Sequence, residues 1–241
     1  MQRMDARFWR WQLLGLMSYG LVLLLVFRLW PLDEWLIAPY VGTLSQPFPL
    51  KETWLLTTIA HDGLKRLVII FVVCLLVLIG LGQKYPSLNA YRSTMWFVIA
   101  AMAASSGLVG ILKAFSHHSC PWHLTMYGGV GGIEYPLLGV IPIDAGVGKC
   151  FPGGHAAGGF ALLALYFAAK AYGLRQAWRC ALIGLGMGML MGYAQMMRGA
   201  HFMSHNLWTL WWTWLVQLVI FAGWQMACRP QRPMIQTVEV G

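Results

Sequence analysis

Six long runs of apolar residues, separated by polar or basic connections, dominate the pattern of the chain. Each run is long enough for a helix that crosses a bilayer. The first run follows a basic segment but has no small-residue cleavage site after it, so we interpret it as a retained helix and not as a signal peptide. The pattern predicts an all-α, polytopic membrane protein with one domain over residues 1–241 and six transmembrane helices at about 9–29, 65–82, 94–113, 155–171, 178–197 and 206–226.

Composition excludes a soluble globular protein. Hydrophobic residues make up 59% of the 241 residues and charged residues only 10%, against roughly 25% charged residues in a soluble domain. The net charge of +9 would suggest nucleic-acid binding in a soluble chain, but the basic residues mostly flank the apolar runs and form no single patch. Nucleic acid is therefore not an expected partner.

The distribution of Lys and Arg orients the predicted helices. Most basic residues fall on one side when both termini are cytoplasmic, with a cytoplasmic tail over residues 227–241. The opposite side then carries two long connections, at about 30–64 and 114–154, and a short one at about 198–205. All seven histidines lie on or near these connections. The pattern predicts a multi-pass protein of the bacterial inner membrane whose active site faces the periplasm.

Three segments beside this outer surface carry the candidate chemistry. They are residues 113–122, 151–155 and 198–206. Glycines at the start of a helix let backbone N–H groups approach an oxyanion, and the lysine and arginine of these segments add positive charge. One histidine can attack phosphorus while a second protonates the departing oxygen. The residues thus predict a phosphoryl-transfer site that needs no metal and no other cofactor.

The same three segments resemble the signature motifs of the PAP2 superfamily, the type 2 phosphatidic acid phosphatases. The family's motifs are commonly written KxxxxxxRP, PSGH and SRxxxxxHxxxD, and their order and placement on six helices match this chain over roughly residues 95–215. The resemblance implies a PAP2-like helical bundle. It also implies that His201 is the nucleophile, His155 the general acid and Lys113 a phosphate ligand.

Four motif positions differ from the family pattern. They are Cys120 and Gln195, where the family has arginine, Gly153, where it has serine, and His205, where it has aspartate. Arg198 lies one helical turn from Gln195 and is expected to reach the same phosphate, while Lys149 is expected to replace the charge lost at Cys120. A neutral His205 is expected to accept a hydrogen bond from His201. The predicted catalytic residues are His201, His155 and His205, and the predicted phosphate ligands are Lys113, Lys149, Gly153, Gly154 and Arg198.

Two cysteines lie beside the prolines of the first two segments. Cys120 and Cys150 both fall on the predicted outer side, where a periplasm permits disulfides. We predict a disulfide between them, which would close a loop of about thirty residues and stabilise the fold by roughly 3 to 4 kcal/mol. His117, His118 and His123 accompany Cys120, but their spacing fits no closed metal motif and we predict no metal site.

The sequence therefore predicts a membrane lipid phosphatase that acts through a phosphohistidine. Its substrate would be an anionic lipid phosphate or diphosphate, such as phosphatidate, phosphatidylglycerophosphate, undecaprenyl diphosphate or phosphorylated lipid A. One alternative is a lipid phosphotransferase with the same mechanism, and another is a catalytically silent protein or transporter that binds anionic lipids. A metal-dependent membrane protein that uses the loop histidines is a third alternative.

Overall fold

The computed structural model describes residues 2–137 and 139–228, and within these ranges the protein is all-α with no β-strand. The predicted tail is described only as far as residue 228, and the rest of it lies outside the described residues. The α-helices are α1 (Ala6–Leu29), α2 (Leu32–Ile37), α3 (Leu64–Leu81), α4 (Pro86–Asn89), α5 (Arg92–Ala114), α6 (Gly154–Phe160), α7 (Ala164–Ala171), α8 (Ala177–Met197) and α9 (Met203–Ala227). Short turns of other helix types are η1 (Ala38–Tyr40), η2 (Leu55–Gly63), η3 (Pro121–His123), η4 (Thr125–Tyr127) and η5 (Ala161–Leu163).

Five of these helices are long and apolar enough to cross a membrane. They are α1, η2 joined to α3, α5, α8 and α9. The second begins at Leu55, about ten residues earlier than the pattern predicts. The reason is that η2, a π-helical segment, continues directly into α3, so that residues expected in a polar connection are helical. This extension carries His61 and Asp62.

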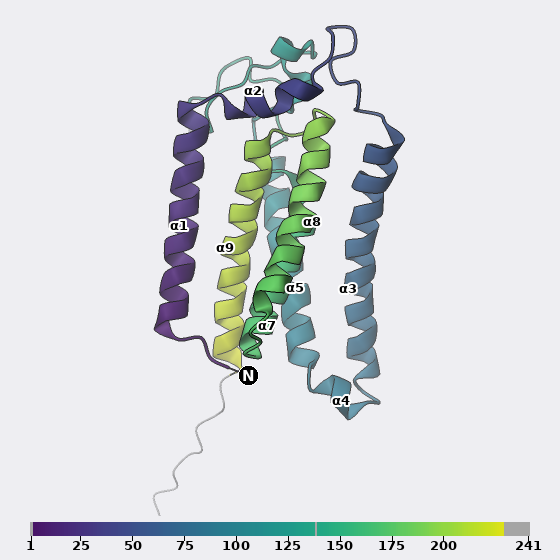
Figure 1. Ribbon diagram of the computed structural model, residues 1–241, viewed down its shortest axis with the longest axis vertical. Coiled ribbons are helices and arrows are strands. Elements are labelled where there is room, and N and C mark those ends of the chain that lie inside the picture. Colours follow the sequence, from purple (N-terminus) through teal and green to yellow (C-terminus); the bar gives the residue numbers. More distant parts are fainter. Residues whose placement is uncertain (1, 138, 229–241) are drawn as a thin grey trace, which may run out of the picture.

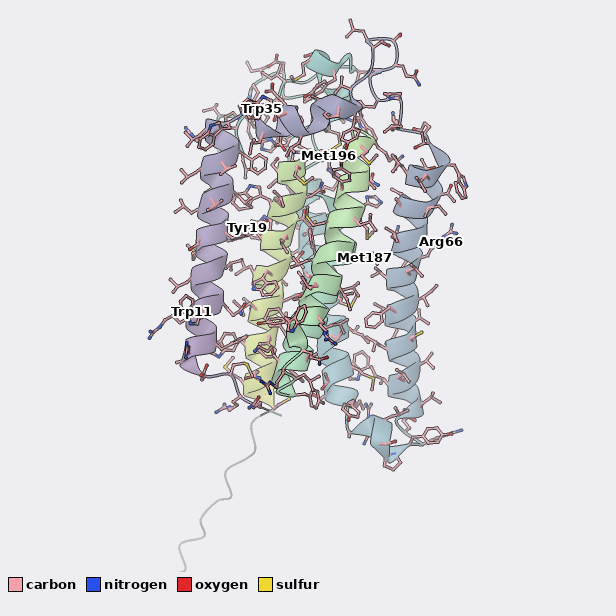
Figure 2. The ribbon with its side chains drawn as sticks, in the orientation of Figure 1. Trp11, Tyr19, Trp35, Arg66, Met187 and Met196 are labelled. Carbon is pink, nitrogen blue, oxygen red and sulfur yellow. A yellow bond between two sulfur atoms is a disulfide. The ribbon has the colours of Figure 1, made fainter. Side chains whose placement is uncertain are left out.

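The helices stand side by side with their axes nearly parallel (Figure 1). Helix α2 lies across one end of the bundle, where the long connections also gather, and α4 lies at the other end together with the described start of the chain. The connections that carry the histidines therefore share one end of the molecule. Large apolar side chains are exposed, such as Trp11 on the flank formed by α1 and Trp35 on α2 at the end of the bundle, as a surface in contact with lipid and its interface requires (Figure 2).

Residues 154–171 form a sixth helical stretch that is interrupted in its middle. Helices α6 and α7 are joined by the 3₁₀ turn η5, and the side-chain amide of Gln217 on α9 donates to the carbonyl of Ala161 at 2.8 Å. This contact gives the carbonyl at the interruption a partner within the protein, which a polar group buried in a membrane needs. Helices α6 and α8 touch closely, because a Cβ on Gly159 would lie only 2.5 Å from the backbone nitrogen of Gly188.

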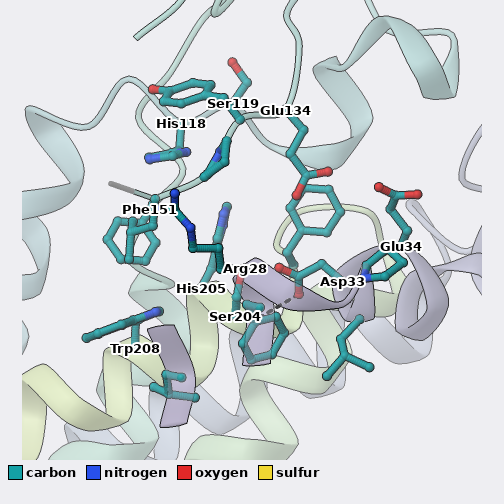
Figure 3. Close-up of a pocket in the computed structure, with 18 of the residues that line it drawn as sticks. Arg28, Asp33, Glu34, His118, Ser119, Glu134, Phe151, Ser204, His205 and Trp208 are labelled. Atoms are coloured by element: carbon teal, nitrogen blue, oxygen red, sulfur yellow. Dashed lines mark hydrogen bonds between the residues drawn. The ribbon is translucent and has the colours of Figure 1, made fainter. Parts of the chain in front are cut away.

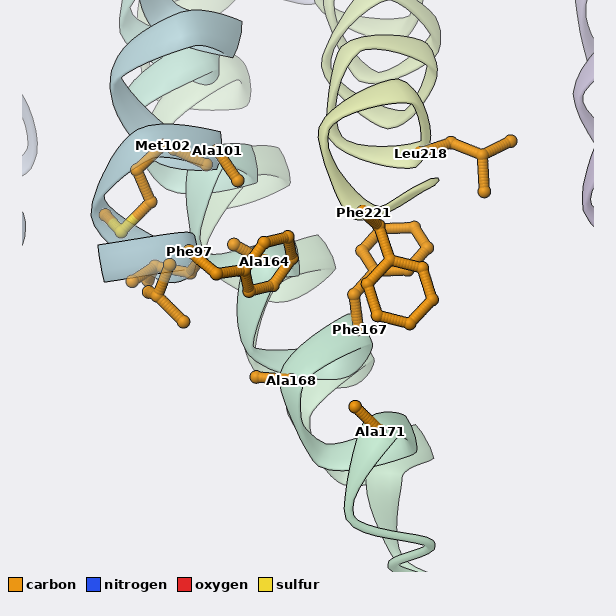
Figure 4. Close-up of a cluster of buried hydrophobic side chains, with 12 residues drawn as sticks. Phe97, Ala101, Met102, Ala164, Phe167, Ala168, Ala171, Leu218 and Phe221 are labelled. Atoms are coloured by element: carbon orange, nitrogen blue, oxygen red, sulfur yellow. The ribbon is translucent and has the colours of Figure 1, made fainter. Parts of the chain in front are cut away.

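The main apolar core lies in the half of the bundle away from the histidines (Figure 4). Phe97 of α5, Phe167 of α7 and Phe221 of α9 are its largest members, and small residues of α7 such as Ala164 and Ala168 let the helices approach (Figure 4). The ring centroids of Phe167 and Phe221 are 5.2 Å apart. This core fixes α5, α7 and α9 relative to one another. Helices α5 and α9 carry parts of the first and third predicted motifs, and α7 is joined through η5 and α6 to the second.

Candidate active site

The first and second motif segments meet where α5 ends and α6 begins. Lys113 lies in the last turn of α5, and Gly154 is the first residue of α6. A Cβ on Gly154 would be 3.7 Å from the Nζ atom of Lys113, so the ammonium group lies against the start of α6. An anion bound at this point would face the positive charge of the lysine, as the sequence predicts.

His201 and His205 lie together in the third segment. They are only 3% and 5% exposed, and their ring centroids are 5.8 Å apart. Burial, and then the neighbouring His205 and Lys113, hold the pKa of His201 well below its ordinary value. The imidazole of His201 is therefore neutral near pH 7, which leaves a ring nitrogen with a free lone pair, as a nucleophile requires.

His155 packs against a residue that the sequence analysis did not assign to the site. Its ring centroid is 3.9 Å from that of His61, and the Nδ1 atom of His61 is 2.7 Å from a carboxylate oxygen of Asp62. The sequence placed His61 on the outer side with the other histidines but gave no signal that it would touch His155. That contact depends on the extension of α3 by η2, which carries the imidazole and carboxylate to the start of α6.

The predicted cationic side chains differ in their burial and in their contacts. Arg198, 9% exposed, donates through Nε to the carbonyl of Lys51 at 2.8 Å and through Nη1 to the Oε1 atom of Gln195 at 3.4 Å. Arg198 therefore shares one face with Gln195 although α8 ends at Met197. Burial, then the neighbouring His61 and the positive charges of Lys113, Lys65 and Arg198, lower the pKa of His155 to about 4. Lys149, in contrast, is exposed in the loop before Cys150, and Lys65 was not predicted.

A buried asparagine explains why the second segment has a glycine where the family has serine. A Cβ on Gly153 would lie 2.4 Å from the Oδ1 atom of Asn206, which is fully buried. The N–H of Gly153 donates to the carbonyl of His205 at 3.1 Å, and the hydroxyl of Thr209 donates to the carbonyl of Gly153 at 3.2 Å. The N–H of Gly153 thus holds the second segment to α9 and is already hydrogen-bonded, whereas the sequence predicts that it binds phosphate.

Cys120 and Cys150 are at disulfide distance, with Cα atoms 5.1 Å apart. The Sγ atom of Cys150 also lies 3.4 Å from the Nδ1 atom of His201. Cys150, His201 and His205 have potential ligand atoms within 4.8 Å of one another, which is a different group from the loop histidines considered for metal. With Cys150 paired to Cys120 only the two histidines would be left to bind an ion, fewer than a structural zinc site uses.

The sequence model of the PAP2 superfamily matches residues 94–229, which contain all three motif segments. The chain belongs to the PAP2 superfamily. Comparison with curated proteins and with solved structures gives no match. Membership supports a phosphatase-type, phosphoester-cleaving function for this PAP2 protein. The matched region includes His155 and His201. His61, Asp62 and the whole of α1 lie before it, in a part of the chain that the family model does not match.

Proposed function

We propose that this PAP2 protein is a membrane lipid phosphatase whose nucleophile is His201. The observation that carries the proposal is the convergence of a buried, neutral His201, a second histidine at position 155 and the ammonium group of Lys113 at one end of a helical bundle. These three groups come from three different helices or connections. Together they supply a nucleophile, an acid and a fixed positive charge, which phosphoryl transfer requires.

The reaction would take place in two steps. A ring nitrogen of His201 attacks phosphorus, the bond from phosphorus to the leaving oxygen breaks, and His155, which the negative charge of the bound phosphate favours in its protonated form, gives its proton to that oxygen. Water then attacks the phosphohistidine while His155 takes a proton from it, which releases inorganic phosphate and restores both histidines. Lys113 and Arg198 would stabilise the negative oxygens around phosphorus.

His205 is proposed to orient His201 in place of the aspartate of the family motif. The two rings are close but share no hydrogen bond, contrary to the expectation from the sequence: the Nδ1 atom of His205 has no partner among the described residues, and the Nδ1 atom of His201 lies 3.4 Å from the Sγ atom of Cys150. We propose that Cys120 and Cys150 form a disulfide that fixes the first and second segments to each other. Lys149, exposed in the intervening loop, would act on an incoming headgroup by its charge and not by direct contact with the histidines.

The substrate proposed is an anionic lipid phosphate or diphosphate that enters from the outer leaflet. The long connections gather at one end of the bundle (Figure 1), and the histidines lie on or beside them, while many of the basic residues flank the helix ends on the opposite side. Under the positive-inside rule this arrangement favours an active site on the periplasmic face of a bacterial inner membrane. A headgroup there would reach Lys113 with its chains still in the bilayer.

The test is release of inorganic phosphate by the purified protein in detergent and EDTA. The panel contains phosphatidate, phosphatidylglycerophosphate, undecaprenyl diphosphate and phosphorylated lipid A. We expect turnover of at least one lipid, and loss of about 10³-fold or more in His201→Ala and His155→Ala. His117→Ala is the matched control, because His117 is an exposed histidine of the same outer surface, and it should retain activity.

Two results would overturn the proposal. One is turnover that survives His201→Ala, since the nucleophile would then be another group. The other is binding of these lipids with no turnover and no acid-labile phosphate on the protein, which would identify a silent lipid-binding member of the family. Loss of activity in EDTA that zinc restores would instead support the metal-dependent alternative.

A further inference from the structure

A cavity of about 680 Å³ lies behind His205. It is bounded by the outer half of α1, by α2, by the second long connection and by the start of α9 (Figure 3). His205 is part of its wall, but Lys113, His155 and His201 are not among the residues that line it. The cavity therefore adjoins the proposed phosphate site at His205 but is not lined by these three residues. Its volume falls in the range of small-molecule pockets, roughly 300–1,000 Å³.

One wall of the cavity is continuous with the lipid-facing surface. Leu21 and Leu25 of α1 line it and are also 56% and 47% exposed on the flank of a membrane-spanning helix. Trp208 and Phe151 form an apolar wall on the opposite side from the acidic residues (Figure 3). A hydrocarbon chain in the bilayer therefore has an apolar path into the cavity.

The other side of the cavity is acidic. Asp33, Glu34 and Glu134 line it together (Figure 3), and Arg28 is the single Lys or Arg residue among the lining residues. In the described part of the chain the only ion pair joins His61 to Asp62, so no cationic side chain lies within 4.0 Å of these three carboxylates. Asp33 is held by the N–H of Ser204 at 2.9 Å, whereas the structure gives Glu34 and Glu134 no such partner within the described residues.

Electrostatics agree with the geometry. The surrounding protein atoms, and then the negative charges of Asp33 and Glu34, raise the pKa of Glu134 although this residue is exposed. Burial raises the pKa of Asp33 to about 6 against the opposing hydrogen bonds from Ser204. Carboxylates that repel one another in this way are stabilised when a cation is added between them.

We propose that this cavity binds a membrane amphiphile with a cationic ammonium headgroup. Its chain would lie between α1 and Trp208, and its ammonium group would donate to Glu34 and Glu134. A primary ammonium has three donors and no acceptor, which suits a pair of carboxylates. The acidic residues exclude the anionic headgroups expected at Lys113. The proposal goes beyond the phosphatase function and does not depend on it.

The experiment uses the full-length protein in detergent with two photoreactive probes. Both have the same single chain with a diazirine near its middle, and they differ only in a primary amine or a hydroxyl at the end. After irradiation, mass spectrometry locates the labelled peptides. We expect the amine probe to label residues 21–30 and 204–208 at least tenfold more than the hydroxyl probe at equal concentration, because charge-assisted hydrogen bonds to carboxylates are strong.

Variants test the headgroup contacts. Glu34→Gln and Glu134→Gln should each weaken labelling by the amine probe about tenfold and leave labelling by the hydroxyl probe unchanged. Glu52→Gln is the matched control, since Glu52 is an exposed acid of the first connection that does not line the cavity. His155→Ala, which should abolish phosphatase activity, should label normally, so failure of the phosphatase proposal would remain distinguishable.

Three outcomes would overturn the inference. Equal labelling by the two probes would show that the cavity binds the apolar chain but does not recognise the headgroup. Labelling that the two glutamate variants do not change would remove the carboxylates from the site. Labelling confined to other helices, with none on α1 or α9, would show that the cavity is closed to amphiphiles.

Discussion

Restoring the family's serine at position 153 should damage this protein. In the structure a Cβ at Gly153 would lie 2.4 Å from the Oδ1 atom of Asn206. An ordinary contact needs roughly 1 Å more, so Asn206 would have to move by about that distance. Asn206 is fully buried and donates through Nδ2 to the carbonyls of Gly192 at 2.9 Å and Phe202 at 3.3 Å. The serine can therefore enter only by displacing an anchored side chain.

The cost can be estimated from these contacts. Overpacking a buried site costs about 1–3 kcal/mol, and each weakened hydrogen bond adds about 1 kcal/mol. The backbone at Gly153 has φ of −73°, which serine adopts without strain, so the backbone itself contributes nothing. We expect Gly153→Ser to lower the free energy of unfolding by about 2–4 kcal/mol.

The assay is denaturant unfolding of purified variants in one detergent, followed by fluorescence. Asn206→Ala removes the obstacle, so Gly153→Ser combined with Asn206→Ala should lose about 1–3 kcal/mol less than the sum of the single variants. Gly158→Ala is the matched control, because a Cβ there would lie 3.7 Å from Met191, an ordinary contact. The reasoning is refuted if Gly153→Ser is as stable as this control, or if the two substitutions are additive.

Three further predictions concern the residues around His201. Cys120→Ser should lower the free energy of unfolding by roughly 3 to 4 kcal/mol, because a loop of 30 residues loses its closure; if a reducing agent leaves the unfolding of the wild type unchanged, the pair is not a disulfide. If His61 supports His155 as an acid, His61→Ala should slow phosphate release by about 10-fold to 100-fold and alter the pH profile of that release. Asp62→Asn should have a smaller effect on the same rate. A change in KM alone would contradict this role. Because the pKa of buried His201 is depressed while the unfolded chain takes up a proton near pH 6.5, the unfolding midpoint should fall as pH drops below about 6.5, and a midpoint that stays constant down to pH 5 would refute it.

The sequence by itself determined the class of the protein and the order of its motifs. Apolar runs such as residues 94–113 and 206–226 are properties of consecutive residues, and in a bilayer each must satisfy its own backbone hydrogen bonds as a helix. Their positions agree with α5 and α9 to within a few residues. The motif histidines can also be recognised from the sequence, because the chemistry of His155 and His201 depends on residue type and on short spacings within each motif. Family membership follows from the same local information.

Tertiary structure alone decided which distant residues meet. His61 and His155 are far apart in the sequence, and their contact follows from the way η2 extends α3 beside α6. Gly153 departs from the family pattern because of Asn206, a neighbour that only the packing of α9 supplies. The cavity behind His205 likewise needs α1, α2 and α9 together. Hydropathy indicates whether a segment can span the membrane. The contacts described here depend instead on how helices pack against one another, which no local sequence pattern encodes.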